Sequence, residues 1–340
     1  MAFKRLKWYR NTGLMLLALL WLLTGCGDDD TGTTPVQFYN NPLDASIVTS
    51  DIPLFWKTFD AAGNSFTAEV FKKDYFDVGT EALALFFEQK IKNASKLSNN
   101  LNSPGVRDYY LGIRENTENL EAATDDIYAG FSQLKQLYEE AVFSDIVFVI
   151  GALSTGGTVV KNGQMVIGTE MFAIDDNTPL DGLNSWQRSV VRNRTFLPSI
   201  VIHELVHVQQ MRIANERGSS ILTGRTLLDL SLAEGSADFI TDLVLGEFFN
   251  DFIHDYADPI EQDLWREFEP EMSNTNTTRW LYNGANAGNR PGDLGYYVGY
   301  KIAEHFYNQS GDKTAAIKSI LEIQNGQDFL VLSGYASKFD

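Results

Sequence analysis

Cysteine, histidine and basic residues are scarce in this sequence, and these scarcities exclude certain classes of structure and partner. It has one cysteine in 340 residues, so no internal disulfide can form and a hydrophobic core must hold the fold together. Lysine and arginine total 27 against 45 aspartates and glutamates, and the net charge of −18 argues against nucleic acid as a partner, because phosphate binding needs basic surfaces. Histidine occurs only four times, so chance rarely produces a regular spacing of histidines in this chain.

The sequence also lacks an apolar run of the about 20 residues that a membrane-spanning helix needs. Its longest run, residues 14–23, follows a basic segment and leads into the letters LTGC, which end at Cys26. This pattern is similar to a bacterial lipobox, in which the cysteine becomes the lipidated N-terminus. We therefore predict a lipoprotein signal peptide over residues 1–25 and a lipid anchor (palmitate) on Cys26. A plain secretory signal that contains a cysteine is the alternative.

A polar, acidic stretch follows the predicted anchor and begins with three aspartates at positions 28–30. Such a composition does not pack, so residues 26–40 are predicted to form a flexible tether. Acidic residues directly after a lipidated cysteine resemble surface-export signals of Bacteroidota lipoproteins, although a solvated tether would have the same composition. The expected location is the cell envelope, anchored through lipid to a bacterial membrane. The outer membrane is the expected one, and the membrane face stays open.

The rest of the chain, residues 41–340, is predicted to form one domain. The chain is 44% apolar and 12% aromatic, which is typical of a folded protein. Apolar residues recur at helical spacing in 78–92 and in 106–141, and the second segment is long enough for one or two helices. Residues 38–59 are predicted to be irregular, with a strand-like patch at 45–49.

A small sheet is predicted in the middle of the chain. Residues 145–150 form a β-branched, apolar run that is typical of a buried strand. Two further runs, 158–160 and 164–168, flank an Asn162-Gly163 turn and predict a β-hairpin. The fold class that follows is α+β, mainly helical, with a small β-sheet that precedes the histidine-containing helix described next.

The pattern H-E-x-x-H occurs once, as His203, Glu204 and His207. Residues four apart lie on the same face of a helix, so both imidazoles can point at one metal ion, with the carboxylate of Glu204 beside them as a general base. The surrounding residues are apolar, which predicts a buried helix. Two histidines and a glutamate are costly to bury there without a metal, so we predict a zinc site rather than satisfied core histidines.

Zinc bound by two histidines needs a third protein ligand, and the sequence offers two carboxylates downstream. Glu234 and Asp238 are four apart in a second helical segment and share a face. We assign Glu234 as the metal ligand and Asp238 as the partner that fixes the tautomer of a liganding imidazole. The swapped assignment is the alternative, and a solvated first helical turn is another.

Together these motifs resemble the gluzincin arrangement of zinc metallopeptidases, HExxH followed by a glutamate on the next helix. The segments EGSAD at 234–238 and LGYYVGY at 294–300 are similar to a family of predicted zinc-dependent proteases related to the gliding-motility lipoprotein GldB of Bacteroidota. The resemblance covers roughly residues 40–340. It implies a zincin-like fold with a helical C-terminal part. Members of the gliding branch need not retain the zinc motif, whereas this chain has a complete one.

A gluzincin needs a tyrosine or histidine that donates to the oxyanion formed during peptide hydrolysis. The second segment supplies candidates, and Tyr296 is our assignment, with Tyr297, Tyr300 and His305 as alternatives. An aromatic helix face packed in the core would have the same pattern.

The expected function is that of a lipid-anchored zinc metallopeptidase. Zinc bound by His203, His207 and Glu234 would lower the pKa of a bound water, and Glu204 would take its proton and return it to the leaving amine. The expected partners are a peptide or protein substrate, which the predicted hairpin could pair with, and the membrane that holds the anchor. The alternative is a non-catalytic lipoprotein component of a gliding-motility or secretion assembly.

Overall fold

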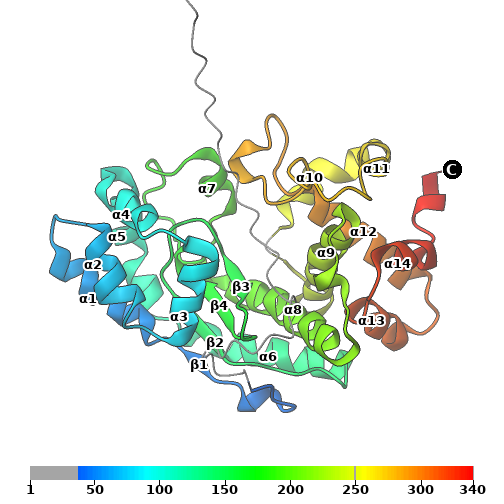
Figure 1. The fold of residues 1–340 in the computed structure, drawn as a ribbon, viewed down its shortest axis with the longest axis horizontal. Helices are drawn as coiled ribbons and strands as arrows, with labels where there is room; N and C mark the ends of the chain where they lie inside the picture. The colour runs from blue at the N-terminus through cyan, green and yellow to red at the C-terminus, as the bar shows by residue number, and fades with distance from the viewer. Residues whose placement is uncertain (1–36, 249, 340) are drawn as a thin grey trace, which may run out of the picture. The chain divides into compact units, whose positions relative to one another are not determined.

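The structure is a computed structural model that describes residues 37–248 and 250–339 (Figure 1). The predicted signal peptide, Cys26 and most of the predicted tether lie outside the described residues. Within the described ranges, no helix is both long and apolar enough to cross a membrane.

A four-stranded sheet forms the small β part of the domain. The strands lie in the order β1 (Ile47–Val48), β2 (Ile146–Val149), β4 (Met165–Gly168) and β3 (Gly157–Val159). The first three are parallel, whereas β3 pairs antiparallel with β4 and forms an edge of the sheet. The predicted hairpin and buried strand are confirmed, and β2 and β4 are buried along their full length because they carry apolar residues on both faces.

Helices account for most of the remaining structure and confirm the α+β class. The segment 106–141 contains two helices that meet near Leu120. The segment 78–92 holds a short α-helix that continues as a π-helical turn, Phe87–Ile91. The prediction for 38–59 was partly wrong, because a full helix begins at Asp51. The helices are α1 Asp51–Ala62, α2 Ala68–Phe71, α3 Glu81–Phe86, α4 Ser95–Asn102, α5 Pro104–Glu118, α6 Glu121–Leu137, α7 Ser185–Val190, α8 Leu197–Arg217, α9 Leu227–Leu245, α10 Phe252–Ala257, α11 Glu261–Phe268, α12 Leu294–Gln309, α13 Lys313–Leu321 and α14 Gly326–Ser333.

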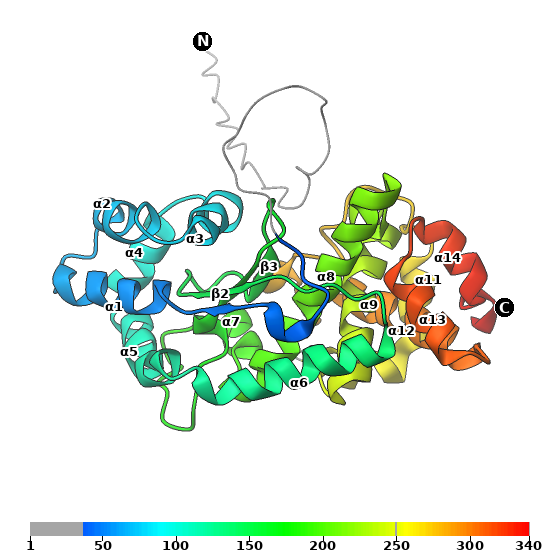
Figure 2. The same ribbon diagram turned by 90° about the horizontal axis from the view of Figure 1, so that it is seen from below.

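The histidine-containing helix α8 is buried among other elements. Pro198 lies in its first turn, where the missing N–H costs no hydrogen bond, and Gly218 ends it in the left-handed conformation. It contacts β3 and β4 on the sheet, and α6 and α9 among the helices (Figure 2). Every side chain from Leu197 to Met211 is buried, so any polar group in this stretch needs a partner inside the protein.

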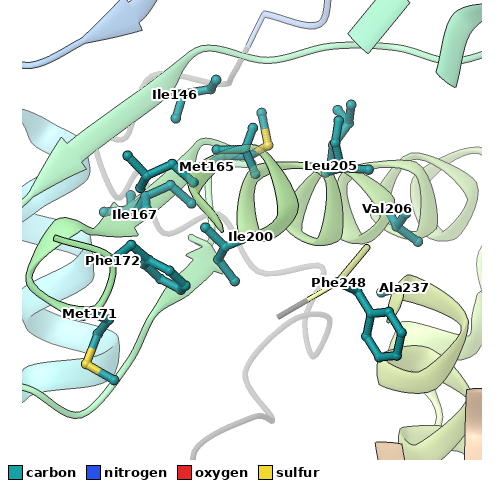
Figure 3. Close-up of a cluster of buried hydrophobic side chains, with 14 of the residues drawn as sticks. Ile146, Met165, Ile167, Met171, Phe172, Ile200, Leu205, Val206, Ala237 and Phe248 are labelled. Atoms are coloured by element: carbon teal, nitrogen blue, oxygen red, sulfur yellow. The ribbon is translucent and has the colours of Figure 1, made fainter. Parts of the chain in front are cut away.

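The core between the sheet and α8 is apolar. Ile146 and Met165 from the sheet and Ile200 and Leu205 from α8 belong to the cluster of buried apolar side chains that Figure 3 shows. Branched and flexible apolar side chains fill this layer and hold α8 against the sheet. The packing therefore fixes where the histidines of α8 lie in the protein.

Helices α9 and α12 approach each other unusually closely because small residues face one another at the crossing. A Cβ added at Gly299 would lie 1.7 Å from the carbonyl oxygen of Ser231, and one added at Gly235 would lie 2.2 Å from the backbone nitrogen of Tyr300. The glycines of the LGYYVGY segment are therefore explained by helix packing, which brings the first turn of α12 beside α9.

We predict that Gly299→Ala lowers the free energy of unfolding by about 3 kcal/mol or more, because the methyl group meets backbone that cannot move aside as a side chain can. Urea unfolding followed by circular dichroism measures the change. Gly311→Ala is the matched control, since a Cβ there meets nothing within 4 Å. Equal stability of the two variants would contradict the close crossing.

A buried carboxyl group holds the loop that leads from β2 to β3. Glu170 is fully buried and accepts hydrogen bonds from the backbone N–H groups of Gly151 (2.7 Å) and Leu153 (3.1 Å). Burial raises the pKa of Glu170 to about 7, although these two hydrogen bonds act in the opposite direction. The loop also contains a strained backbone position, since Leu153 has φ 55°.

The raised pKa of Glu170 makes stability depend on pH. Because the folded protein holds this proton more tightly than the unfolded chain, we expect the contribution of Glu170 to the free energy of unfolding to fall as pH rises from about 4.5 to about 7, by up to about 3 kcal/mol, and to stay constant above that. Glu170→Gln, neutral throughout, should lack this slope, while Glu69→Gln at an exposed site should keep it. Denaturant titrations across this pH range test both, and an unchanged slope in Glu170→Gln would refute the assignment.

Candidate metal centre

Three side chains from α8 and α9 converge inside the protein. His203 and His207 lie one turn apart on α8, and each Nε2 faces the same carboxylate oxygen, Oε2 of Glu234 on α9, at 3.3 Å and 3.2 Å. One ligand atom from each residue lies within 4.8 Å of the other two, and all three side chains are buried. The structure thus brings together the three residues that the sequence analysis assigned as metal ligands.

The outward nitrogen of His203 has a carboxylate partner. Its Nδ1 lies 2.8 Å from Oδ1 of Asp238, and Oδ2 of Asp238 accepts a hydrogen bond from Nδ2 of Asn250 at 3.0 Å. A carboxylate oxygen only accepts, so Nδ1 donates to Asp238, and Nε2 is the nitrogen that faces the centre and that a metal would bind. Asp238 lies on the far side of the ring from Glu234, and this position favours Glu234 as the metal ligand and Asp238 as the partner of the imidazole.

His207 is fixed in the same way by an amide that the sequence analysis missed. Its Nδ1 lies 2.8 Å from Oε1 of Gln210, while Nε2 of Gln210 donates to the carbonyl oxygen of Ala233 at 3.1 Å. The donor to Ala233 sets the orientation of the amide, so Oε1 of Gln210 accepts from Nδ1 of His207, and Nε2 of His207 is again the nitrogen that faces the centre. The helical spacing of three residues from His207 to Gln210 was a signal that could have identified this partner.

The charges of this cluster favour a cation between the ligands. Burial alone would lower the pKa of His203, but hydrogen bonds to Asp238 and Glu234 outweigh it and raise the pKa to about 10. Burial alone would raise the pKa of Glu234, but the neighbouring histidines hold it well below its ordinary value. The centre therefore stabilises positive charge where the two imidazoles and the carboxylate meet.

Glu204 lies next to this centre on α8 and has an unused oxygen. Its side chain is buried, and among the described residues no hydrogen-bond partner reaches its Oε2. Burial raises the pKa of Glu204, while the two histidines lower it to a smaller extent. On the side of the sheet it faces Gly157 of β3, where a Cβ would lie 2.7 Å from its Oε1. Glycine at this position leaves room for the carboxylate beside the edge strand.

The donor set fits zinc. Two imidazole nitrogens and one carboxylate oxygen are the protein ligands of many catalytic zinc sites, which keep a fourth position for water or substrate. The buried, unpaired oxygen of Glu204 supports such a fit, because a polar atom without a protein partner is expected to bind a group that enters the site.

The tyrosine candidates are placed differently from one another. The ring of Tyr296 stacks on that of His203, with centroids 6.2 Å apart and planes at 15°. Tyr297 donates to Asp258 (3.0 Å) and Tyr300 donates to Asp242 (2.8 Å), so both hydroxyls have other partners. The remaining alternative, His305, packs against Tyr335. Burial and the charge of Glu234 raise the pKa of Tyr296 well above its ordinary value, so its hydroxyl stays protonated and able to donate.

Tyr282 is a site residue that the sequence did not reveal. Its hydroxyl donates to Oε1 of Glu234 at 2.7 Å, although the residue comes from the loop between α11 and α12, where no periodicity or motif marks it.

Comparison with known protein families gives one match. Residues 41–337 match the model of the gliding motility protein GldB. The chain belongs to this family. Membership supports the predicted lipoprotein character, the link to gliding motility and an association with the cell envelope. Neither the curated proteins nor the solved structures contain a match, and nothing in these comparisons supports the expected zinc-protease family.

Proposed function

We propose that this member of the GldB family is a zinc-dependent peptidase of the cell envelope with a zincin-like catalytic domain. The observation that carries the proposal is the convergence of both Nε2 atoms on Oε2 of Glu234, with an unpaired oxygen of Glu204 beside them. In addition, both outward Nδ1 atoms have separate acceptors, which is how zinc-binding histidines are commonly oriented.

The residues have separate roles in the proposed reaction. His203, His207 and Glu234 would hold the ion, which when bound would supply a Lewis acid that lowers the pKa of a water. Glu204 would accept the proton of that water at its free oxygen and return it to the leaving amine. Tyr296 would donate its hydroxyl to the developing oxyanion, as its protonated state and its place beside His203 permit.

The edge strand β3 suits an extended peptide. It pairs with β4 on one side only, and Gly157 brings it into contact with Glu204. A peptide that added a strand to this edge would bind through backbone hydrogen bonds, largely independent of its sequence, with a peptide bond near the base. Attachment to the membrane would come from a lipid on Cys26.

A second function is favoured by the family match. In that case the chain is a non-catalytic lipoprotein of a gliding-motility or secretion assembly, and the buried cluster stabilises the packing of α8 on α9. The two functions differ in whether the centre binds zinc and in whether Glu204 carries out chemistry.

We expect the purified protein to bind about one zinc ion per chain, and His207→Ala to lose it, because two remaining ligands do not retain the metal. Metal analysis after purification without chelators measures this. His305→Ala is the control, since this histidine lies away from the centre, against Tyr335. A wild-type protein without zinc would exclude the peptidase and leave the second function.

We expect Glu204→Gln to keep its zinc but to hydrolyse a fluorescence-quenched peptide library about 10²- to 10⁴-fold more slowly, because the amide cannot accept the proton. Glu216→Gln, on the exposed end of the same helix, is the matched control and should keep full activity. Full activity of zinc-loaded Glu204→Gln would rule out this residue as the base. If the zinc-loaded wild type also leaves the library intact, the second function is favoured.

A further inference from the structure

The two oxygens of Glu234 have different partners. Oε2 faces both histidines, whereas Oε1 accepts the hydrogen bond from the hydroxyl of Tyr282 at 2.7 Å. A carboxylate with both oxygens free can rotate and offer either one or both to a metal. The hydrogen bond from Tyr282 removes that freedom, because it holds one oxygen on the opposite side of the carboxylate from the imidazoles.

The backbone of Tyr282 adopts a conformation that bulky residues rarely have. Its φ is 56°, in the left-handed region. The next residue, Asn283, exchanges two hydrogen bonds with Asp293: each backbone N–H donates to the other's side-chain oxygen, at 3.2 Å and 2.9 Å. These bonds close the loop just after Tyr282 and keep the unusual conformation in place. Such outliers are often associated with functional sites.

Burial of the ring does not explain this placement. Tyr282 is 46% exposed, in contrast to the fully buried Tyr297 on α12. An aromatic side chain that served only to fill the core would be fully buried, whereas Tyr282 stays partly exposed while its hydroxyl reaches a buried carboxylate. Complete burial is therefore not what the loop gains by holding this residue in place, and the hydrogen bond to Glu234 is a specific interaction that its conformation provides.

We propose that Tyr282 is a positioning residue of the candidate metal centre, which ties up Oε1 of Glu234 so that Oε2 alone is presented between His203 and His207. This inference rests on the zinc centre proposed above. It assigns a role to a loop residue through its hydrogen bond to Glu234, and it predicts that the hydroxyl, not the ring, sets how Glu234 binds a metal.

The test compares Tyr282→Phe with the wild type in two measurements. Zinc affinity, obtained by competition with a chromophoric chelator, should fall about 10- to 100-fold, as is typical when a partner of a metal ligand is lost. In the cobalt-substituted protein, the visible absorption should weaken, because a carboxylate that offers both oxygens raises the coordination number above four. Tyr335→Phe is the matched control, because this hydroxyl also donates to a carboxylate, that of Glu261 at 2.9 Å, which does not belong to the candidate metal centre. Its loss should change neither measurement.

The outcomes separate this inference from the proposed centre. Equal zinc affinity and an unchanged cobalt spectrum in Tyr282→Phe would overturn the role of Tyr282 while the centre stands. A wild type that binds neither zinc nor cobalt would overturn the centre, and the inference with it. Should Tyr282→Phe fail to fold by thermal unfolding, Asn283→Ala serves instead, because it opens the loop but leaves the hydroxyl. It should weaken zinc binding in the same direction, and wild-type affinity there would contradict the proposal.

Discussion

Burying ionisable groups in an apolar helix costs free energy, and the elements around α8 supply the interactions that offset this cost. His203, Glu204 and His207 lie in a stretch of α8 whose side chains are all buried, so each must recover inside the protein the interactions that it loses with water. Glu234 on α9 supplies the opposite charge, and its position requires α9 to lie directly beside α8. The acceptors of Asp238 and Gln210 then complete the hydrogen bonds of the two rings. Removing one of these residues would leave buried charged or polar groups of the others without a partner. The stability of the fold therefore depends on the residues of the site.

The close crossing of α9 and α12 has a comparable effect on the other side of the site. Gly299 on α12 and Gly235 on α9 allow backbone contact, which a side chain at either position would prevent. The first turn of α12 is thereby placed next to α9, and Tyr296 comes to lie against His203. The loop just before α12 carries Tyr282 to the second oxygen of Glu234. Two tyrosines, one in α12 and one in the loop before it, thus reach the same centre because α12 packs so tightly on α9.

What the sequence predicted well was local. The spacing of His203 and His207 follows from helical geometry, and the Asn-Gly turn between apolar runs identified the hairpin, because both patterns involve neighbours in the chain. The LGYYVGY segment supplies the predicted oxyanion donor Tyr296, whereas its glycines serve helix packing, which only the structure shows. Tyr282 could not be predicted, since its role depends on a loop conformation fixed by Asn283 and Asp293, ten residues apart. The helix that begins at Asp51 was missed although its buried apolar residues, Ile52, Phe55, Trp56 and Phe59, recur at helical spacing.

Membership of the family does not decide whether this protein is an enzyme. The buried cluster on α8 and α9 bears on that question. The match over residues 41–337 associates the chain with gliding-motility lipoproteins, and such a protein needs α8 and α9 to pack but has no need for a carboxylate oxygen without a partner. For packing alone, well-fitted apolar residues in place of a buried ionic cluster would often be as stable or more so. The cluster here instead has both imidazoles oriented by acceptors at Nδ1, Glu234 fixed at both oxygens, and Glu204 left with a free oxygen beside the glycine of an edge strand. Among the described residues, the three ligands and the partners of the two rings are hydrogen-bonded, while the oxygen of Glu204 that a catalytic base would use has no partner, which is the physical reason for preferring chemistry to a purely structural role.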